Sequence, residues 1–349
     1  MPESLEERAL RIMDLDPATH VVVGGAPKFS RWQLHDGSWR ESVRCQVAER
    51  DQEFDLDSLV KRLHSRRPLR AVPEASGDGD AFIFAVSDMQ LGKGEGGGPA
   101  GTVAIITAAV AEAEQRIKAL RRQGAALDTL VICDVGDATE GVCGHYSTQL
   151  YTVQLDRREQ LRLSREMFTM CVSRLAPLFG RVVLTGVPSN HSENRQAGKM
   201  VTRISDDDGL ATLEQVMEAV RLSERYPQVE LVLPPGDEPW VVLPLGPGLA
   251  IFHGHLAGSS DLERWWSGQA QGKQPVGEAG VLLSGHYHHV RYSEKSGRTW
   301  LQCPAADGGS AWWTNKTGQS SPPGVMSFVL GDAGVSDMQV LGRRLDAAA

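Results

Sequence analysis

The chain has 349 residues, of which 41% are hydrophobic and 23% charged, and its formal net charge is −8. These values are typical of a globular protein with one large domain or two unequal ones. The negative charge disfavours a protein that coats nucleic acid non-specifically, because surfaces that track phosphates are usually basic. No apolar stretch approaches the roughly 20 residues that span a bilayer, and the N-terminus lacks a signal-peptide apolar region. Five scattered cysteines form no CxxC pair, so we expect a cytoplasmic protein without a membrane span.

The first 72 residues differ in pattern from the rest and are predicted to form a small N-terminal α+β unit. The next eight residues, PEASGDGD at 73–80, are small, polar and rich in glycine, which is typical of a linker. Within the N-terminal unit we expect helices over 3–13 and 56–64 and strands over 20–23 and 42–47.

Residues 81–349 alternate short apolar runs with long helical stretches, which predicts a layered α/β domain. Ligands in open α/β sheets bind beyond the carboxyl ends of strands, so the polar residues that follow each run are candidate site residues. Strands are expected at 82–86, 130–133, 182–185, 249–253 and 281–284, with helices at 102–122 and 155–175.

The segment 193–248 is interpreted as an insertion into this domain, and the tail beyond residue 290 is expected to be mostly strands. The insertion is predicted to hold a helix at 213–225 and strands at 229–233 and 240–243. The tail strands are expected at 291–294, 299–303, 325–330 and 335–341, with a loop over 307–323 that can overhang a site.

Five polar clusters follow the apolar runs and carry the chemical prediction. They are SDMQLG at 87–92, GDATE at 136–140, SNH at 189–191, HGH at 253–255 and GHYHH at 285–289. Taken singly each is weak, because a lone histidine is usually structural and a lone Gly-Asp is usually a turn. Together they collect carboxylate, amide and imidazole groups, which suit Mn²⁺, Fe or Zn²⁺, whereas Ca²⁺ or Mg²⁺ prefers oxygen ligands. A metal site is therefore predicted.

The order of these clusters resembles that of the calcineurin-like metallophosphoesterases, whose pattern is D-x-H, G-D, G-N-H-[DE], a lone H and G-H-x-H. The resemblance runs from residue 82 to residue 289. It implies a four-layer α-β-β-α sandwich, here with the small N-terminal appendage, and two divalent metal ions at one edge.

The resemblance also implies a role for each matching residue. Asp88, Gln90 and His288 would bind the first ion, Asp137 would bridge both, and Asn190, His253 and His286 would bind the second. His191 would bind no metal and would stabilise charge on the phosphoryl group or protonate the leaving oxygen.

Three positions depart from the family pattern. Gln90 stands where a histidine is usual, and its neutral amide oxygen is a poor ligand for a soft metal, so Mn²⁺ is favoured over Fe or Zn²⁺. Ser189 replaces a glycine, and Ser192 replaces the usual acid, with Glu193 one residue later.

Two metal ions held together would activate a water for in-line attack on phosphorus, so we expect a metal-dependent phosphoester hydrolase. Asn194, Arg195 and Lys199 follow His191 closely and are expected to contact substrate. Four arginines over 157–165 add modest support for nucleic acid, although such runs are usually solvated. Trp312 and Trp313 could stack a base, although anchors for a long loop are commoner.

A nuclease acting on DNA or RNA is the favoured interpretation, and the motif order resembles SbcD-type DNA-repair exonucleases. That resemblance implies a separate ATPase partner, with a homodimer as another candidate. The alternatives are a small-molecule nucleotide phosphodiesterase or phosphatase and a non-catalytic metal-binding scaffold. His191 argues against the scaffold, since a protein that only binds metal has little need of it.

Overall fold

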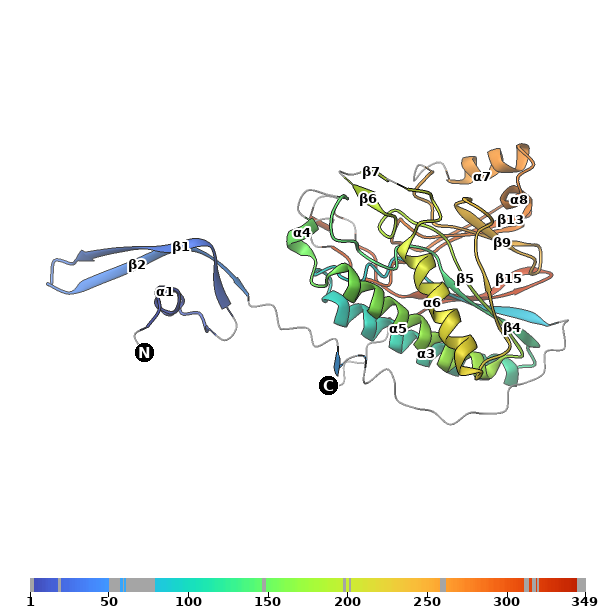
Figure 1. Cartoon of the computed structure of the whole chain (residues 1–349), viewed down its shortest axis with the longest axis horizontal. Coiled ribbons are helices and arrows are strands. Elements are labelled where there is room, and N and C mark those ends of the chain that lie inside the picture. The colour runs from blue at the N-terminus through green and yellow to red at the C-terminus, as the bar shows by residue number, and fades with distance from the viewer. Residues whose placement is uncertain are drawn as a thin grey trace. The chain divides into compact units, whose positions relative to one another are not determined.

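The computed structural model of the chain consists of two compact units, Met1–Asp55 and Leu56–Ala349 (Figure 1). It describes residues 3–17, 20–49, 57–58, 60, 79–145, 149–196, 199–200, 202–257, 262–310, 314–315, 318 and 320–343. Most of the expected helix over 56–64, most of the linker over 73–80, and Trp312 and Trp313 lie outside these residues. The predicted domain boundary at residue 72 therefore stays a prediction.

The N-terminal unit combines one helix with one hairpin, as its α+β pattern predicts. Helix α1 (Leu5–Ile12) begins at Ser4, whose side chain and that of Glu7 cap each other's backbone N–H groups. Strands β1 (His20–Gln33) and β2 (Trp39–Glu49) pair in antiparallel fashion. They are longer than predicted, and their register shifts between Val23 and Lys28.

One sheet of the larger unit has six strands, in the order β15-β14-β3-β4-β5-β8, and so joins its first strands to its last. Strands β3, β4, β5 and β8 run parallel, and β14 and β15 add an antiparallel edge beside β3. The strands are β3 (Asp80–Val86), β4 (Leu127–Asp134), β5 (Arg181–Gly186), β8 (Val229–Val232), β14 (Val325–Gly331) and β15 (Gly334–Leu341).

A second sheet has five strands in the order β12-β13-β11-β10-β9. Its three central strands are parallel, while β9 and β12 run antiparallel at its edges. The strands are β9 (Trp240–Leu243), β10 (Leu249–Phe252), β11 (Val281–Ser284), β12 (Arg291–Lys295) and β13 (Arg298–Gln302).

The main core lies between the two sheets. Ile83 and Val131 from the first sheet and Ile251 and Leu283 from the second belong to one cluster of fully buried side chains. Alternate residues of a strand point to opposite faces, so the same strands offer a second apolar face to helices. Each sheet therefore needs a covering layer on its outer side.

Helices supply both outer layers, which confirms the predicted four-layer α-β-β-α architecture. Helices α3 (Gly98–Arg122), α5 (Arg157–Leu175) and α6 (Asp208–Ser223) lie side by side over the six-stranded sheet (Figure 1). Helices α7 (Leu262–Gln271) and α8 (Pro275–Glu278) cover the other sheet through a cluster that includes Trp266, Phe252 and Leu282. The short elements are α4 (Gln149–Thr152), η1 (Ala176–Leu178), β6 (Arg195–Gln196) and β7 (Lys199–Met200).

The segment 193–248 differs from the expected insertion, because its elements are integral to both sheets. Helix α6 connects β5 to its parallel neighbour β8, and β9 pairs with β10 of the second sheet. Helix α6 also begins at residue 208 instead of 213, because Asp207 caps it by accepting the N–H groups of Gly209 and Leu210. Within the described ranges, no helix is long and apolar enough to cross a membrane.

Candidate metal centre

The seven side chains expected to bind metal all follow strand ends at one edge of the two sheets. Backbone hydrogen bonds hold the loops together: Asp88 N–H donates to Gly136 O at 2.9 Å, and Gln90 N–H donates to Asp137 O at 2.8 Å. Asp88 and Gln90 follow β3, Asp137 follows β4, Asn190 follows β5, His253 follows β10, and His286 and His288 follow β11. Parallel strands within each sheet thus converge on one site, as the strand-end rule predicts.

Five of these seven residues have a left-handed backbone, which side-chain-bearing residues rarely adopt. Their φ angles run from 41° to 70°, at Asp88, Gln90, Asp137, His286 and His288. Each such conformation costs on the order of 1–3 kcal/mol and persists only where its surroundings enforce it. Such strain collects at functional sites, so this backbone agrees with a site built for ligand binding.

One half of the centre joins Asp88 to His288. The Nε2 atom of His288 lies 3.2 Å from Asp88 Oδ1. The other carboxylate oxygen, Oδ2, accepts hydrogen bonds from the Ser87 hydroxyl and from the N–H of His286, the latter at 3.0 Å. Burial would raise the pKa of Asp88, but the neighbouring His288 outweighs it and leaves that pKa below its ordinary value. Asp88 is therefore an ionised, buried carboxylate.

The other half groups Asp137, His253 and His286, whose ligand atoms lie within 4.8 Å of one another. His253 Nδ1 lies 2.8 Å from the carbonyl of Val135, which can only accept, so Nδ1 carries the hydrogen. Its Nε2 then faces Asp137 Oδ2 at 3.1 Å and Asn190 Oδ1 at 3.2 Å. A carbonyl that fixes the distal nitrogen in this way is the usual support of a metal-binding histidine.

A buried carboxylate oxygen shows where a cation fits this centre. Among the described residues, neither Asp88 Oδ1 nor Asp137 Oδ2 accepts a well-aligned hydrogen bond, although each faces a histidine nitrogen. Buried carboxylate oxygens are normally satisfied, and a divalent ion held by Asp137, His253 and His286 would satisfy Asp137 Oδ2. Burial lowers the pKa of His253, but Asp137 raises it more, to about 9, so metal would have to displace a proton there.

His191 is held next to the centre without facing it as a ligand. Its N–H donates to Asp137 Oδ1 at 2.8 Å, and its Nδ1 lies 3.0 Å from the carbonyl of Glu140 and 3.3 Å from Glu140 Oε2. The His145 ring stacks on it, with 4.3 Å between centroids and 5° between planes. Burial lowers the pKa of His191, but Asp137 and Glu140 outweigh it and raise it to about 9. The ring is therefore protonated at neutral pH, with Nε2 as its remaining donor.

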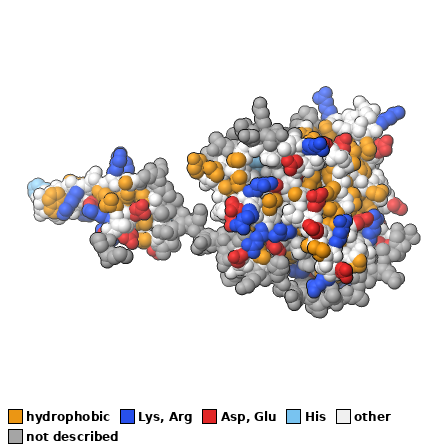
Figure 2. Space-filling model, in the orientation of Figure 1, with side chains coloured by type: hydrophobic (Ala, Val, Ile, Leu, Met, Phe, Trp, Pro, Cys, Tyr) orange, Lys and Arg blue, Asp and Glu red, His pale blue; other side chains and the backbone are white. Residues whose placement is uncertain are grey.

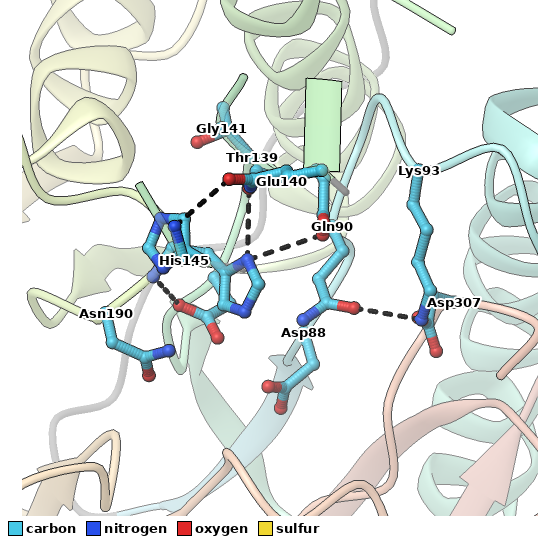
Figure 3. A network of polar contacts seen from close by, with 12 residues as sticks. Asp88, Gln90, Lys93, Thr139, Glu140, Gly141, His145, Asn190 and Asp307 are labelled. Carbon is cyan, nitrogen blue, oxygen red and sulfur yellow. Dashed lines mark hydrogen bonds and ion pairs between the residues drawn. The ribbon is translucent and has the colours of Figure 1, made fainter. Parts of the chain in front are cut away.

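The amide oxygen of Gln90 already accepts a hydrogen bond from another side chain. Lys93 Nζ lies 3.1 Å from Gln90 Oε1 and also pairs with Asp307 Oδ2 (Figure 3). Asp307 Oδ1 in turn lies 3.8 Å from Nδ1 of His288, and its N–H donates to Asp88 O at 3.2 Å. Lys93 thus places a fixed positive charge beside the expected first metal position.

Ser189 supports the centre through its hydroxyl. Its Oγ accepts a hydrogen bond from the N–H of Asp137 at 2.8 Å, and its own N–H donates to Asp207 Oδ2 at 2.9 Å. Ser192 lies close to Thr139, with their hydroxyl oxygens 3.2 Å apart. The serine at position 189 therefore adds a hydrogen bond that a glycine could not make, and it links the centre to the start of α6.

The residues expected to contact substrate are placed differently from one another. Arg195 pairs with Glu193. Burial and the neighbouring His191 lower the pKa of His145 to about 3, and the charge of Arg195 contributes to that shift. Asn194 is exposed. Lys199 belongs to β7, but its side chain lies outside the description. Substrate contact stays a prediction for all three.

Sequence reasoning missed three polar residues of the centre. Lys93 and Asp307 lie outside the motifs, and their pairing joins positions 214 residues apart, which no local pattern can reveal. Asp207 was not expected near the site, because the helix that it caps was predicted to begin at residue 213, yet it holds Ser189. Glu140, the last residue of the predicted cluster at 136–140, is buried against His191.

No protein-family model matches the sequence, and no curated protein matches it. Solved structures do: wild-type Vps29 from Entamoeba histolytica, complexed with Zn²⁺, is 13% identical over 74% of this chain and 98% of its own, with a TM-score of 0.32. A predicted phosphoesterase from Streptococcus pneumoniae is 13% identical over 75% and 90%, with a TM-score of 0.29. An archaeal phosphodiesterase is 12% identical over 74% and 99%, with a TM-score of 0.32. At these identities and TM-scores, function has to be inferred from the site.

Proposed function

We propose that the protein is a metal-dependent phosphoester hydrolase that acts on diesters, with nucleic acid as the favoured substrate class. One observation carries the proposal: the backbone N–H of His191 donates to Asp137, a member of the candidate metal cluster, and its imidazole Nδ1 is held by Glu140 beside that cluster. Metal ligands alone would suit a scaffold. A buried acid beside them has a use only if a bond is broken there.

The ligand set suggests where a cation would be held. Asp137, Asn190, His253 and His286 would bind it, and Mn²⁺ is favoured, with Fe or Zn²⁺ as alternatives. When bound, the ion would supply Lewis acidity to the phosphoryl oxygens and lower the pKa of a water for attack on phosphorus.

The chain's own residues would then act on the leaving group. His191 would donate the proton from Nε2 to the departing oxygen, because its Nδ1 is already engaged by Glu140. The stacked His145 covers one face of the imidazole and restricts its rotation. An alkoxide is a poor leaving group, so an acid at this position matters most for natural diesters, whose leaving oxygen is a sugar hydroxyl.

A polymeric substrate is supported by the surface next to His191. Gln149, at the start of α4, is buried and donates to the carbonyl of Glu140 at 2.8 Å. The next two residues, Leu150 and Tyr151, are 64% and 85% exposed, and Figure 2 shows hydrophobic side chains gathered over α4. Exposed aromatic side chains are the usual stacking surface for unpaired bases, so Tyr151 favours a single-stranded substrate.

The arginines of α5 contribute less than their number suggests. Arg157 pairs with Asp208, Arg162 pairs with Asp57, and Arg165 donates to Gln215 at 3.2 Å. Charges that are already paired on a helix face add little to phosphate binding. The expectation of an ATPase partner or a homodimer stays a prediction, since a single chain carries no information on it.

Hydrolysis of a substrate panel tests the proposal. Metal-stripped protein, re-supplied with Mn²⁺, is given bis-p-nitrophenyl phosphate, p-nitrophenyl phosphate, and labelled single- and double-stranded DNA and RNA. We expect cleavage of the diester and of nucleic acid. Asp137→Asn should lose both activities, whereas His191→Ala should lose cleavage of nucleic acid and keep much of the bis-p-nitrophenyl phosphate activity, because p-nitrophenolate leaves without a proton. His289→Ala is the matched control, because the side chain of that exposed histidine bonds to the Tyr287 carbonyl, and its own backbone bond to Gln302 survives the substitution.

The outcomes separate the candidate functions. Turnover of the monoester alone would replace the diesterase with a phosphatase, and turnover of small diesters without nucleic acid would favour a nucleotide phosphodiesterase. No turnover with Mn²⁺, Fe²⁺ or Zn²⁺ would refute the enzyme and leave a metal-binding scaffold.

A further inference from the structure

The environment of Gln90 departs from what a metal ligand needs. Its Oε1 lies 3.1 Å from the ammonium of Lys93. An ammonium group has three donors and no acceptor, so the amide must turn its oxygen, not its nitrogen, towards Lys93. The amide NH₂ then points in a different direction from the oxygen. A group that carries hydrogens cannot donate a lone pair to a metal ion.

Lys93 is held firmly in this place. Its side chain is 12% exposed, and that of its partner Asp307 is 3% exposed. Pairing is what allows two charged groups to be buried together, since either one alone would be costly to remove from water. The pair is also anchored to the centre, because Asp307 N–H donates to the carbonyl of Asp88. Lys93 is therefore a built-in charge of the site and not a surface side chain that happens to reach it.

The first position is left with few ligands. Asp88 Oδ1 and His288 Nε2 lie 3.2 Å apart, but Gln90 Oε1 is bound to a cation. A divalent ion that shared this oxygen would stand next to the ammonium and be repelled by it. The second position keeps its ligands, because the ligand atoms of Asp137, His253 and His286 lie within 4.8 Å of one another and Asn190 Oδ1 lies 3.2 Å from His253 Nε2.

We propose that the centre binds one divalent ion per chain, at Asp137, Asn190, His253 and His286, and that the Lys93 ammonium supplies the positive charge of the second ion. This inference rests on the metal-dependent function proposed above. Lysine is suited to the role, since its ammonium is a compact point charge that attracts phosphoryl oxygens. Lys93 would then draw the substrate phosphate towards the ion, while Asp307 keeps the ammonium in place.

The metal content of the folded protein tests this inference without any activity measurement. Metal-stripped protein is incubated with excess Mn²⁺, passed through gel filtration and analysed by mass spectrometry of the metal. Electron paramagnetic resonance then distinguishes an isolated Mn²⁺ ion, with six lines, from a spin-coupled pair. We expect one ion per wild-type chain and an uncoupled spectrum.

Variants locate the effect at Lys93. Gln90→His, which supplies the missing imidazole but keeps the lysine, should still bind one ion. Lys93→Met combined with Gln90→His should bind two, with a coupled spectrum. Lys93→Arg preserves the charge and should bind one, so it also serves if the methionine variant fails to fold. The matched control is Lys118→Met, an exposed lysine on α3, which should leave the content at one.

Each result decides something. Two ions in the wild-type chain, or in Lys93→Arg, would overturn the inference while leaving the phosphoesterase intact. A content of one in a folded Lys93→Met, Gln90→His variant would also overturn it, because removing the charge would then have restored nothing. No bound metal in any variant would refute the metal-dependent function itself.

Discussion

Replacing Gly136 with alanine should damage the metal centre by displacing His253, although the substitution changes no proposed metal ligand. Gly136 has a φ of +105°, and an added Cβ would lie 2.4 Å from His253 Nδ1 and 2.8 Å from Ser189 Cβ. His253 Nδ1 is the atom that bonds to the carbonyl of Val135. The new methyl group must therefore push the imidazole off the hydrogen bond that orients its other nitrogen.

The magnitude follows from two contributions. An alanine with a positive φ costs about 1–2 kcal/mol, and breaking a buried hydrogen bond costs about 1–3 kcal/mol more. Gly136→Ala should thus lower the free energy of unfolding by roughly 2–5 kcal/mol. Disturbing a support of a metal ligand usually lowers affinity about 10- to 100-fold, and we expect that loss for Mn²⁺.

Gly254→Ala is the matched control, because Gly254 has a similar φ of +115° but its added Cβ would meet no atom closer than 3.6 Å. Gly254→Ala should lower the free energy of unfolding only by the cost of the backbone conformation, about 1–2 kcal/mol, and should keep most of its Mn²⁺ affinity. Calorimetric titration with Mn²⁺ and urea unfolding measure the two quantities. Equal losses of Mn²⁺ affinity in the two variants would refute the displacement of His253.

Three further predictions concern protons. His191→Ala should reduce kcat roughly 10²- to 10⁴-fold on diesters with an alkoxide leaving group. The reduction should be far smaller with p-nitrophenolate, which leaves without a proton. Equal reductions of kcat for the two leaving groups would contradict an acid role for His191. Burial lowers the pKa of His253, but Asp137 raises it more, to about 9. Mn²⁺ binding at pH 8 should therefore release a proton from His253, and Mn²⁺ affinity should fall at lower pH. Calorimetric titration in buffers of different ionisation enthalpy measures the number of protons released. Burial raises the pKa of Asp134 from 3.8 to about 8, so the native state keeps a proton that the unfolded chain releases between those values.

The sign of the Asp134 effect follows directly. Between pH 4 and pH 8 the native state holds more protons than the unfolded state, so stability should fall as pH rises through this range. Asp134→Asn carries no titratable group and should lose that part of the pH dependence. Urea midpoints at pH 5 and pH 8 give the comparison, and an unchanged slope in the variant would count against a protonated Asp134.

Much of the fold was predictable because its strands are buried on both faces. The runs that became β3, β4 and β5 are almost entirely apolar, and every one of them ends in a polar cluster. Errors arose where tertiary contacts decide. The segment 193–248 carries no local mark that β8 and β9 belong to different sheets, since that depends on pairing with β5 and β10.

The site divides in the same way. Its expected ligands could be proposed because they stand at strand ends in a recognisable order. Lys93 could not, because nothing in the sequence distinguishes it from the other seven lysines until the fold brings Asp307 to it. The departure at Gln90 was visible in the sequence, but its cause was not. Only the hydrogen bond from Lys93 explains why an amide oxygen, which can bind a cation, is bound to an ammonium instead.

The most direct test of the central claim is the rate of bis-p-nitrophenyl phosphate hydrolysis as Mn²⁺ is added back to metal-stripped protein. Wild-type protein should show no activity at first, then a rate that rises with Mn²⁺ and saturates. Asp137→Asn replaces the carboxylate shared by the candidate metal cluster and His191 with a neutral amide, and this variant should stay inactive at the same Mn²⁺ concentrations. Hydrolysis that is independent of Mn²⁺, or an Asp137→Asn variant as active as the wild type, would contradict the account.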